Sequence, residues 1–327
     1  MSDAYLNFRE FYRSRTHPDC LGKRHILSKR FGLKSFGGSR DTSLLPPYWE
    51  DENCVAGIHF NTPGLTDCPK QSSKMVFVGA GVSVETSETS FPELDWMDEA
   101  LVLGEDVVYI NMGSMFIWQK HEFQHCIAGF KAAYKQRAGR VRFLFKINFP
   151  LDSRQDFSID ELPDYIRLTN WIENQHAIYS HAALKIFIHH GGGNSFNEAV
   201  YFGIPQLVLS QWLETHEYAN YAQQFSLGLR SERPPYVDAD DIEAKILTLL
   251  GPSWATYKSN CRAWAVRSQI AGGAASAAKI VLSHAHSTEL QDSMLTPPIS
   301  PIDTPPLEEK DPEILKGILR LSYLRDG

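Results

Sequence analysis

A turn of three glycines, between an apolar run and a helical pattern, is the part of the sequence best suited to binding a phosphate. Lys185–Ile188 reads as a short buried strand, and Gly191–Gly193 follow it after two histidines. Glycines let the backbone approach an anion closely, and the amides that open the next helix point toward it. His190, Asn194 and Ser195 add side-chain donors. We therefore predict a phosphate site here rather than a bare strand–turn–helix corner.

Glu198 lies one turn into the predicted helix, which Gly203 ends and Pro205 stops. A carboxylate at that depth is poorly placed for a phosphate but well placed to accept hydrogen bonds from two ribose hydroxyls. The turn lacks the Gly-Lys-Ser/Thr ending of a Walker loop and the G-x-G-x-x-G spacing of a dinucleotide fold. The residue types therefore predict a site for the phosphate and ribose of a nucleotide.

The segment 171–217 resembles the donor-sugar signature of the family-1 nucleotide-sugar-dependent glycosyltransferases, the UDP-glycosyltransferases of GT-B fold. The matching residues are Trp171, Gln175, His181, the run from His190 to Ser195, Glu198, Gly203, Pro205 and Glu214. The segment is most similar to fungal members, which have Gly-Gly-Gly-Asn-Ser. It departs from the family by one extra residue between Trp171 and Gln175. Glu214-Thr215 stands where the family has Asp-Gln, so the identity of the sugar stays open.

The resemblance implies that the matching residues bind a UDP-sugar. Trp171 would stack on uracil, Glu198 would hold the ribose, and Glu214 would hold sugar hydroxyls. His190, Asn194 and Ser195 would hold the diphosphate. The implied donor-binding set is Gly113, Ser114, Trp171, Gln175, His190, Gly192, Asn194, Ser195, Glu198, Glu214 and Thr215. The UDP-sugar is a substrate in this family, and neither a cofactor nor a metal is implied.

Polar loops at Ser114, Trp171, His190 and Glu214 each follow a predicted strand. Loops at the carboxyl ends of parallel strands meet at one edge of a doubly wound sheet, so these four should converge. We expect strands at 106–110, 142–147, 166–168, 185–188, 206–209 and 227–229. Helices are expected from Tyr218 onward, over 238–250 and over 254–281, the last with a break at Gly272-Gly273. The prediction is an α/β fold, and the resemblance implies a GT-B-type, Rossmann-like doubly wound parallel sheet.

A zinc-protease pattern, H-E-x-x-H, occurs at 121–125. Two histidines one helical turn apart can bind zinc, with Glu122 as the base. We reject this interpretation because the pattern is short and no further ligand motif follows. Phe123, Ile127 and Phe130 form an apolar stripe, so the histidines should lie on the solvated face of the helix.

The N-terminal part of the chain resembles only the end of the family's acceptor domain. Strands are predicted at 54–60 and 74–78. The family's catalytic base is a histidine near the start of that domain, and no residue among His17, His25 and His59 has the right context. The catalytic residue is therefore unknown. We divide the chain into an acceptor-domain remnant with linker (1–90), a donor domain (91–286), a Pro-rich disordered linker (287–307) and a C-terminal helix (308–327).

Composition limits the kinds of partner and compartment. The net charge of −7 gives no basic surplus for nucleic acid. Five cysteines show neither metal spacing nor an even count, which favours reduced thiols in the cytoplasm. No run of about 18 apolar residues occurs, and the polar N-terminus is unlike a signal peptide, so we expect no membrane span.

The resemblance implies inverting transfer of a hexose from a UDP-sugar to a hydroxyl of a small lipophilic acceptor. The acceptor oxygen would attack the anomeric carbon as UDP leaves. With so short an N-terminal region, the chain is either a transferase with a reduced acceptor half or one that needs a partner chain to supply it. Two alternatives remain: a UDP-sugar-binding module without transfer activity, and, less favoured, an enzyme similar to UDP-N-acetylglucosamine epimerases.

Overall fold

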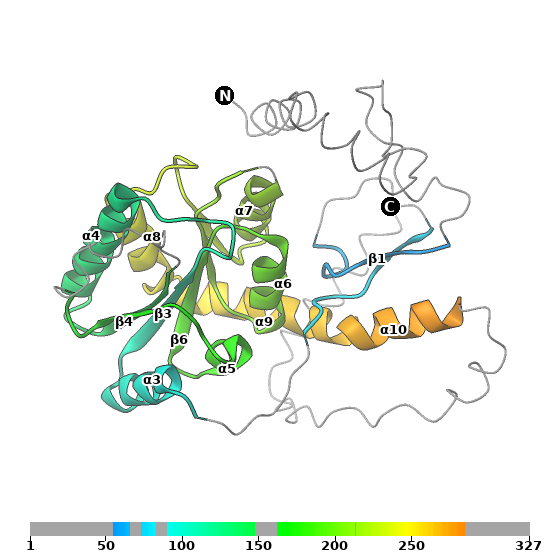
Figure 1. Ribbon diagram of the computed structural model, residues 1–327, viewed down its shortest axis with the longest axis horizontal. Coiled ribbons are helices and arrows are strands. Elements are labelled where there is room, and N and C mark those ends of the chain that lie inside the picture. The colour runs from blue at the N-terminus through cyan, green and yellow to red at the C-terminus, as the bar shows by residue number, and fades with distance from the viewer. Residues whose placement is uncertain (1–54, 66–72, 83–89, 148–161, 213, 285–327) are drawn as a thin grey trace, which may run out of the picture.

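The computed structural model describes residues 55–65, 73–82, 90–147, 162–212 and 214–284. Most of them form one parallel sheet with helices on both faces (Figure 1). Its strands are β3 (Asp106–Asn111), β4 (Val141–Lys146), β5 (Ile166–Thr169), β6 (Leu184–His189), β7 (Gln206–Val208) and β8 (Gly228–Arg230), in the order β5-β4-β3-β6-β7-β8. The first strand of this sheet, β3, lies near its middle, and later strands are added on both sides of it, which is the doubly wound arrangement. The predicted α/β class is confirmed.

Alternate residues of the central strand β3 enter two different cores. Val108 and Ile110 pack with residues of α4 (Lys120–Gln136) and α8 (Ala239–Leu249) on one face. Val107 and Tyr109 pack on the other face with α3 (Pro92–Leu103) and α5 (Gln175–Ser180). This alternation is what the two-residue period of a strand demands when both faces are covered.

The H-E-x-x-H pattern lies in α4, and its Glu122 and His125 make contacts that support the fold. Phe123, Ile127 and Phe130 are buried against the sheet, as the apolar stripe predicts, and both histidines are exposed. The Glu122 carboxylate accepts a hydrogen bond from the Gln119 backbone amide at 2.9 Å and completes a capping box. His125 Nδ1 lies 2.8 Å from the Val237 carbonyl oxygen and joins the helix to the loop before α8.

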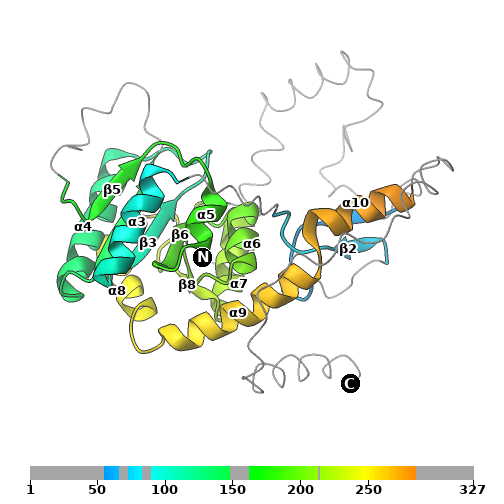
Figure 2. The same cartoon turned by 90° about the horizontal axis from the view of Figure 1, so that it is seen from below.

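The N-terminal strands β1 (Gly57–His59) and β2 (Met75–Phe77) form a separate two-stranded parallel sheet. The last helices, α9 (Trp254–Ile270) and α10 (Gly273–Ser283), run from the large sheet to this small one (Figures 1 and 2). The Gly273 amide donates to the Val78 carbonyl at 2.6 Å. A Cβ at Gly273 would lie 2.3 Å from the Ala80 oxygen, so this junction requires glycine.

The loop after β1 also contacts the helices of the large sheet. Leu65 is fully buried among residues that include Phe196 of α6 (Gly193–Tyr201). The Asn61 side-chain oxygen accepts from Asn197 Nδ2 at 2.7 Å and from the Tyr218 hydroxyl at 3.2 Å. The two predicted N-terminal strands are confirmed, and the segment that contains them is packed against the rest of the fold.

One predicted boundary is wrong. Helix α7 (Glu214–Gln224) begins four residues before the expected start at Tyr218, so Glu214 and Thr215 lie in its first turn rather than in a loop. The acidic side chains Glu214 and Glu217 favour a helix start here, because they lie near the positive end of the helix dipole. The short helix α5 was also not expected.

The division into domains at 90 and 286 stays a prediction, and the predicted linker at 287–307 and helix at 308–327 lie outside the described residues. Within the described ranges, no helix is both long enough and apolar enough to cross a lipid bilayer.

Candidate functional site

Polar side chains form one row across four neighbouring strands at the carboxyl edge of the sheet. Asn111 at the end of β3 is in register with Lys146 of β4 and with His189 of β6. Lys146 is in turn in register with Thr169 of β5. Side chains at matching positions of parallel strands point to the same face, which here is the face covered by α3 and α5. The loops that the sequence singled out begin directly after this row.

The His190 ring lies in a gap that two glycines leave open. A Cβ at Gly113 would lie 2.7 Å from the ring, and a Cβ at Gly192 would lie 2.5 Å from it. Trp212 borders the ring, with centroids 5.7 Å apart. The buried His190 Nδ1 has no hydrogen-bond partner among the described residues, and burial lowers the pKa of the ring. The imidazole is therefore fixed in position with one polar atom unsatisfied.

His189 shapes the turn instead of facing a ligand. The Gly191 amide donates to His189 Nδ1 at 3.0 Å, which leaves the proton on Nε2, 2.8 Å from Gln206 Oε1. Burial lowers the pKa of His189 to about 3, so the ring is neutral at any ordinary pH. Gly191 has φ +88°, and a Cβ there would lie 2.6 Å from the Thr215 carbonyl oxygen. The turn accepts no side chain at this position.

Helix α6 begins directly after this turn, with Gly192 as its N-cap. Its first turn contains no acidic side chain, so nothing within the helix compensates the positive end of its dipole. Asn194 is exposed and Ser195 is half-buried. The amides and these two side chains can donate to an anion placed beside the His190 ring.

Gln175 organises a polar network around Glu198. Gln175 Nε2 donates to Glu198 Oε2 at 3.1 Å and to the Tyr179 hydroxyl at 2.6 Å. Its Oε1 accepts from Asn111 Nδ2 at 2.8 Å and from the Tyr109 hydroxyl at 3.2 Å. Burial raises the pKa of Glu198, which is half-buried. The carboxylate is thus held in one orientation at the edge of the site.

Trp171, just beyond β5, presents its indole to solvent, with 74% of the residue exposed. The Thr169 hydroxyl donates to the Trp171 carbonyl at 2.7 Å and fixes the backbone here. Lys146 Nζ lies 5.2 Å from the centroid of the indole ring. A large aromatic surface left exposed beside a row of polar groups is suited to stacking.

The residues after β7 lie on the other side of the His190 ring. Glu214 is exposed and close enough to His190 to raise the pKa of that ring, against the larger effect of burial. Thr215 is fully buried, and its hydroxyl accepts from the amides of Gln211 and Trp212 at 3.0 and 2.9 Å. Its side chain therefore shapes the loop, and a contact from Thr215 to a sugar is not favoured by this geometry.

The loop after β3 completes the site. Gly113 has φ +75°, and its amide donates to the Asn111 side-chain oxygen at 2.9 Å. This bond turns the chain away from the sheet and leaves Ser114 exposed at the edge. Asn111 thus holds both this turn and Gln175 in place.

The predicted site residues follow the order of the strands. Trp171 comes after β5, Gly113 and Ser114 after β3, His190 to Ser195 after β6, and Glu214 after β7. Along the edge, the exposed indole of Trp171 is therefore followed by the anion donors of the His190–Ser195 segment and then by the exposed carboxylate of Glu214. Glu198, on α6, is bonded to Gln175 of α5. That arrangement suits a ligand with a base, a ribose, a diphosphate and a polar group, in that order.

Sequence reasoning missed four residues that border the site: Tyr109, Asn111, Lys146 and Tyr179. A usable signal existed for two of them. Asn111 and Lys146 are the first polar residues after apolar strand runs, and a polar residue at a parallel strand's carboxyl end lies at the ligand edge. Nothing local distinguishes Tyr109 and Tyr179 from core aromatics.

The chain is similar to proteins named as transferases. The family model described as "Erythromycin biosynthesis protein CIII-like, C-terminal domain" matches residues 140–271. Erythritol-mannosyl-transferase 1 of Pseudozyma antarctica (strain T-34) is 36% identical over 382 aligned positions, covering 87% of this chain and 62% of that protein. The protein of the same name from Mycosarcoma maydis is 35% identical over 381 positions, with the same coverage.

This chain thus spans 62% of the length of these curated relatives. The alignment of 382 positions is longer than the chain's 327 residues, so the relatives contain residues within the aligned region that this chain lacks.

Two solved structures are similar in fold. The glycotransferase of kitacinnamycin is 16% identical, with a TM-score of 0.60 over 85% of this chain and 65% of that one. Os79 from O. sativa in complex with UDP is 16% identical, with a TM-score of 0.54 over 64% of this chain and 50% of that one. At this identity the likeness shows a shared fold.

Proposed function

We propose that this chain is a family-1 UDP-glycosyltransferase and that it binds a UDP-sugar along the carboxyl edge of the sheet, which its similarity to the named relatives and solved structures supports. The observation that supports this most directly is the order of the loops. Trp171 offers a surface for the base, and His190 with the start of α6 offers donors for the diphosphate. Glu214 lies beyond them, where the sugar of such a ligand would extend.

In this proposal the network around Gln175 orients Glu198 toward the ribose. Gln175, Tyr179 and Asn111 already fix the carboxylate before any ligand arrives, so ribose binding costs little further ordering. The His190 ring borders Gly113 and Gly192 directly before the start of α6, so it lies next to the amides proposed to hold the diphosphate.

We propose that the reaction is transfer of a hexose to a hydroxyl of a small acceptor, with inversion. The acceptor oxygen attacks the anomeric carbon, the bond to the diphosphate oxygen breaks, and UDP leaves with that electron pair. The α6 amides, Ser195 and His190 would stabilise the charge that develops on the diphosphate. The names of the relatives suggest mannose as the sugar and erythritol as the acceptor. The base that takes the acceptor proton is not assigned.

The proposal keeps the division at residue 90 between an acceptor-domain remnant and the donor domain. A partner chain that supplies the acceptor domain is kept as part of the proposal. We also propose a cytoplasmic location, supported by the free, buried thiols of Cys126 and Cys261.

The test is calorimetric titration of the purified chain with UDP, alongside assays of hydrolysis and transfer. The donors are UDP-glucose and a nucleoside-diphosphate mannose, and each is assayed with and without erythritol. UDP binding with turnover supports transfer by the chain alone. UDP binding without turnover would leave a donor-binding half that lacks the acceptor region. Absence of any nucleotide binding would refute the proposal for the whole edge.

A further inference from the structure

Lys146 is a lysine at the candidate site that forms no ion pair with any residue the structure describes. It is half-buried at the carboxyl end of β4. The described contact of its ammonium is with the Trp171 ring, 5.2 Å from the centroid. Burial lowers the pKa of Lys146, as expected for a cation that loses part of its hydration.

The backbone of Lys146 is held in place by pairing with the strands on both sides of it. Its backbone is in register with Thr169, which precedes the Trp171 loop, and with Asn111, which bonds to Gln175. The side chain therefore starts between the exposed indole and the network that holds Glu198. In the proposed function, these are the places of the base and the ribose.

We propose that Lys146 donates a hydrogen bond to a ring carbonyl oxygen of the nucleobase stacked on Trp171, and so selects bases that have such a carbonyl. The inference rests on the proposed function, since it assumes a nucleotide at this edge. Uracil and guanine present carbonyl oxygens that accept from an ammonium, whereas adenine has none. Stacking on an indole is tolerant of base identity, so the platform by itself discriminates weakly.

A diphosphate partner for Lys146 is less consistent with the sheet order. The loops that offer anion donors follow β3 and β6, and β4 lies on the opposite side of β3 from β6. β4 is paired with both β5 and β3, and the described contact of the ammonium, 5.2 Å from the Trp171 ring centroid, is on the β5 side. That contact places the ammonium at the stacking surface.

The experiment compares binding of UDP and ADP to the wild-type chain and to Lys146→Met, with Kd measured in a displacement format that extends to weak ligands. ADP shares the ribose and diphosphate of UDP, so a change confined to UDP must arise at the base. We expect Lys146→Met to weaken UDP about tenfold, the loss of one charged hydrogen bond in a half-exposed setting, and to leave ADP unchanged. Lys146→Arg, which retains a donor and the charge, should keep most of the preference for UDP.

A matched control is available at the other end of the sheet. Lys185 Nζ lies 5.5 Å from the Trp254 ring, a similar lysine–tryptophan pair remote from the site. Lys185→Met should change neither affinity. Equal losses of UDP and ADP in Lys146→Met would overturn the inference in favour of a ribose or diphosphate contact, and no loss of either would overturn it outright. Failure of the wild-type chain to bind UDP would refute the proposed function itself, which is a distinct result.

Discussion

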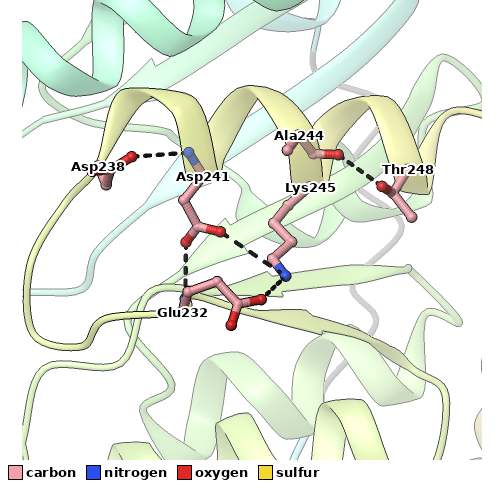
Figure 3. Close-up of polar contacts among 6 residues, drawn as sticks. All are labelled: Glu232, Asp238, Asp241, Ala244, Lys245 and Thr248. Carbon is pink, nitrogen blue, oxygen red and sulfur yellow. Dashed lines mark hydrogen bonds and ion pairs between the residues drawn. The ribbon is translucent and has the colours of Figure 1, made fainter.

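Two polar clusters lie at the carboxyl edge of the same sheet and differ in how completely they are paired. In the cluster beside β8, Lys245 contacts the carboxylates of Glu232 and Asp241 (Figure 3). Asp241 also accepts from the Glu232 amide at 2.9 Å, and Asp238 caps α8 by accepting from the Asp241 amide at 3.0 Å. Each of the charged side chains of this cluster has a partner of opposite charge or a backbone donor.

The cluster at the ends of β3 to β6 is incomplete. Lys146 has no carboxylate partner among the described residues, His190 Nδ1 is buried without a hydrogen bond, and Trp171 is largely exposed. The β8 cluster is paired within the fold, whereas the other cluster lies where we propose that a nucleotide binds. Variants of the two clusters should therefore separate effects on stability from effects on binding.

The largest effect is expected for Gly191→Ala. The new Cβ would approach the Thr215 carbonyl oxygen at 2.6 Å from a backbone with φ +88°, so both the turn and the start of α7 must shift. Strain and a displaced loop together should weaken UDP binding by about a hundredfold or more and lower stability by about 2 kcal/mol. Titration and thermal melting measure both. Wild-type affinity in this variant would show that the turn does not hold the diphosphate.

Glu198→Ala should weaken UDP by about tenfold, through loss of the ribose acceptor. Because burial raises the pKa of Glu198, its carboxylate is protonated at a higher pH than an ordinary glutamate. The UDP affinity of the wild-type chain should therefore decline as the pH falls through that raised pKa. The alanine variant should not show this decline, because it has no carboxylate to protonate. The UDP affinities of both proteins are measured by calorimetry at a series of pH values. The variant shows how much of the pH dependence comes from protonation of UDP. Parallel pH profiles would remove Glu198 from the ribose site.

Trp171→Ala should cost UDP binding about 1–3 kcal/mol if the indole stacks on the base. Since Trp171 is 74% exposed, the melting temperature should hardly change. Tyr236 is a control with similar exposure, 72%, on the loop before α8. Its alanine variant should leave UDP affinity intact, and an equal loss in both variants would mean that Trp171 has no specific role.

The smallest effect is expected for Lys245→Met in the paired cluster. Its ion pairs are partly exposed, so their loss should lower the free energy of unfolding by about 1 kcal/mol or less. Affinity for UDP should be unchanged. A loss of UDP affinity comparable to that of a site variant would remove the distinction between the two clusters.

Most of the large sheet could be predicted from the sequence, because its strands are buried on both faces. Runs such as Val107–Ile110 and Ile186–Ile188 contain no charged residue, and glycine or proline bounds the elements that follow them. The start of α7 could not be predicted from the sequence, because it depends on a loop in which the Thr215 hydroxyl accepts from the backbone amides of Gln211 and Trp212. Side-chain bonds of that kind leave no periodic pattern.

The sequence by itself determined the glycine turn, the carboxylate one helical turn beyond it and the strand–loop order, because residue types and spacing along one continuous segment specify all three. The tertiary structure alone decided how the site is held and where it is incomplete. Gly113 and Gly192, which are 79 positions apart in the sequence (192 − 113), both leave room for the His190 ring, and Asn111 contacts Gln175 across 64 residues. Lys146 reaches Trp171 only because β4 and β5 are paired in register. Contacts between distant segments depend on the packing of the whole sheet, and no local pattern encodes them.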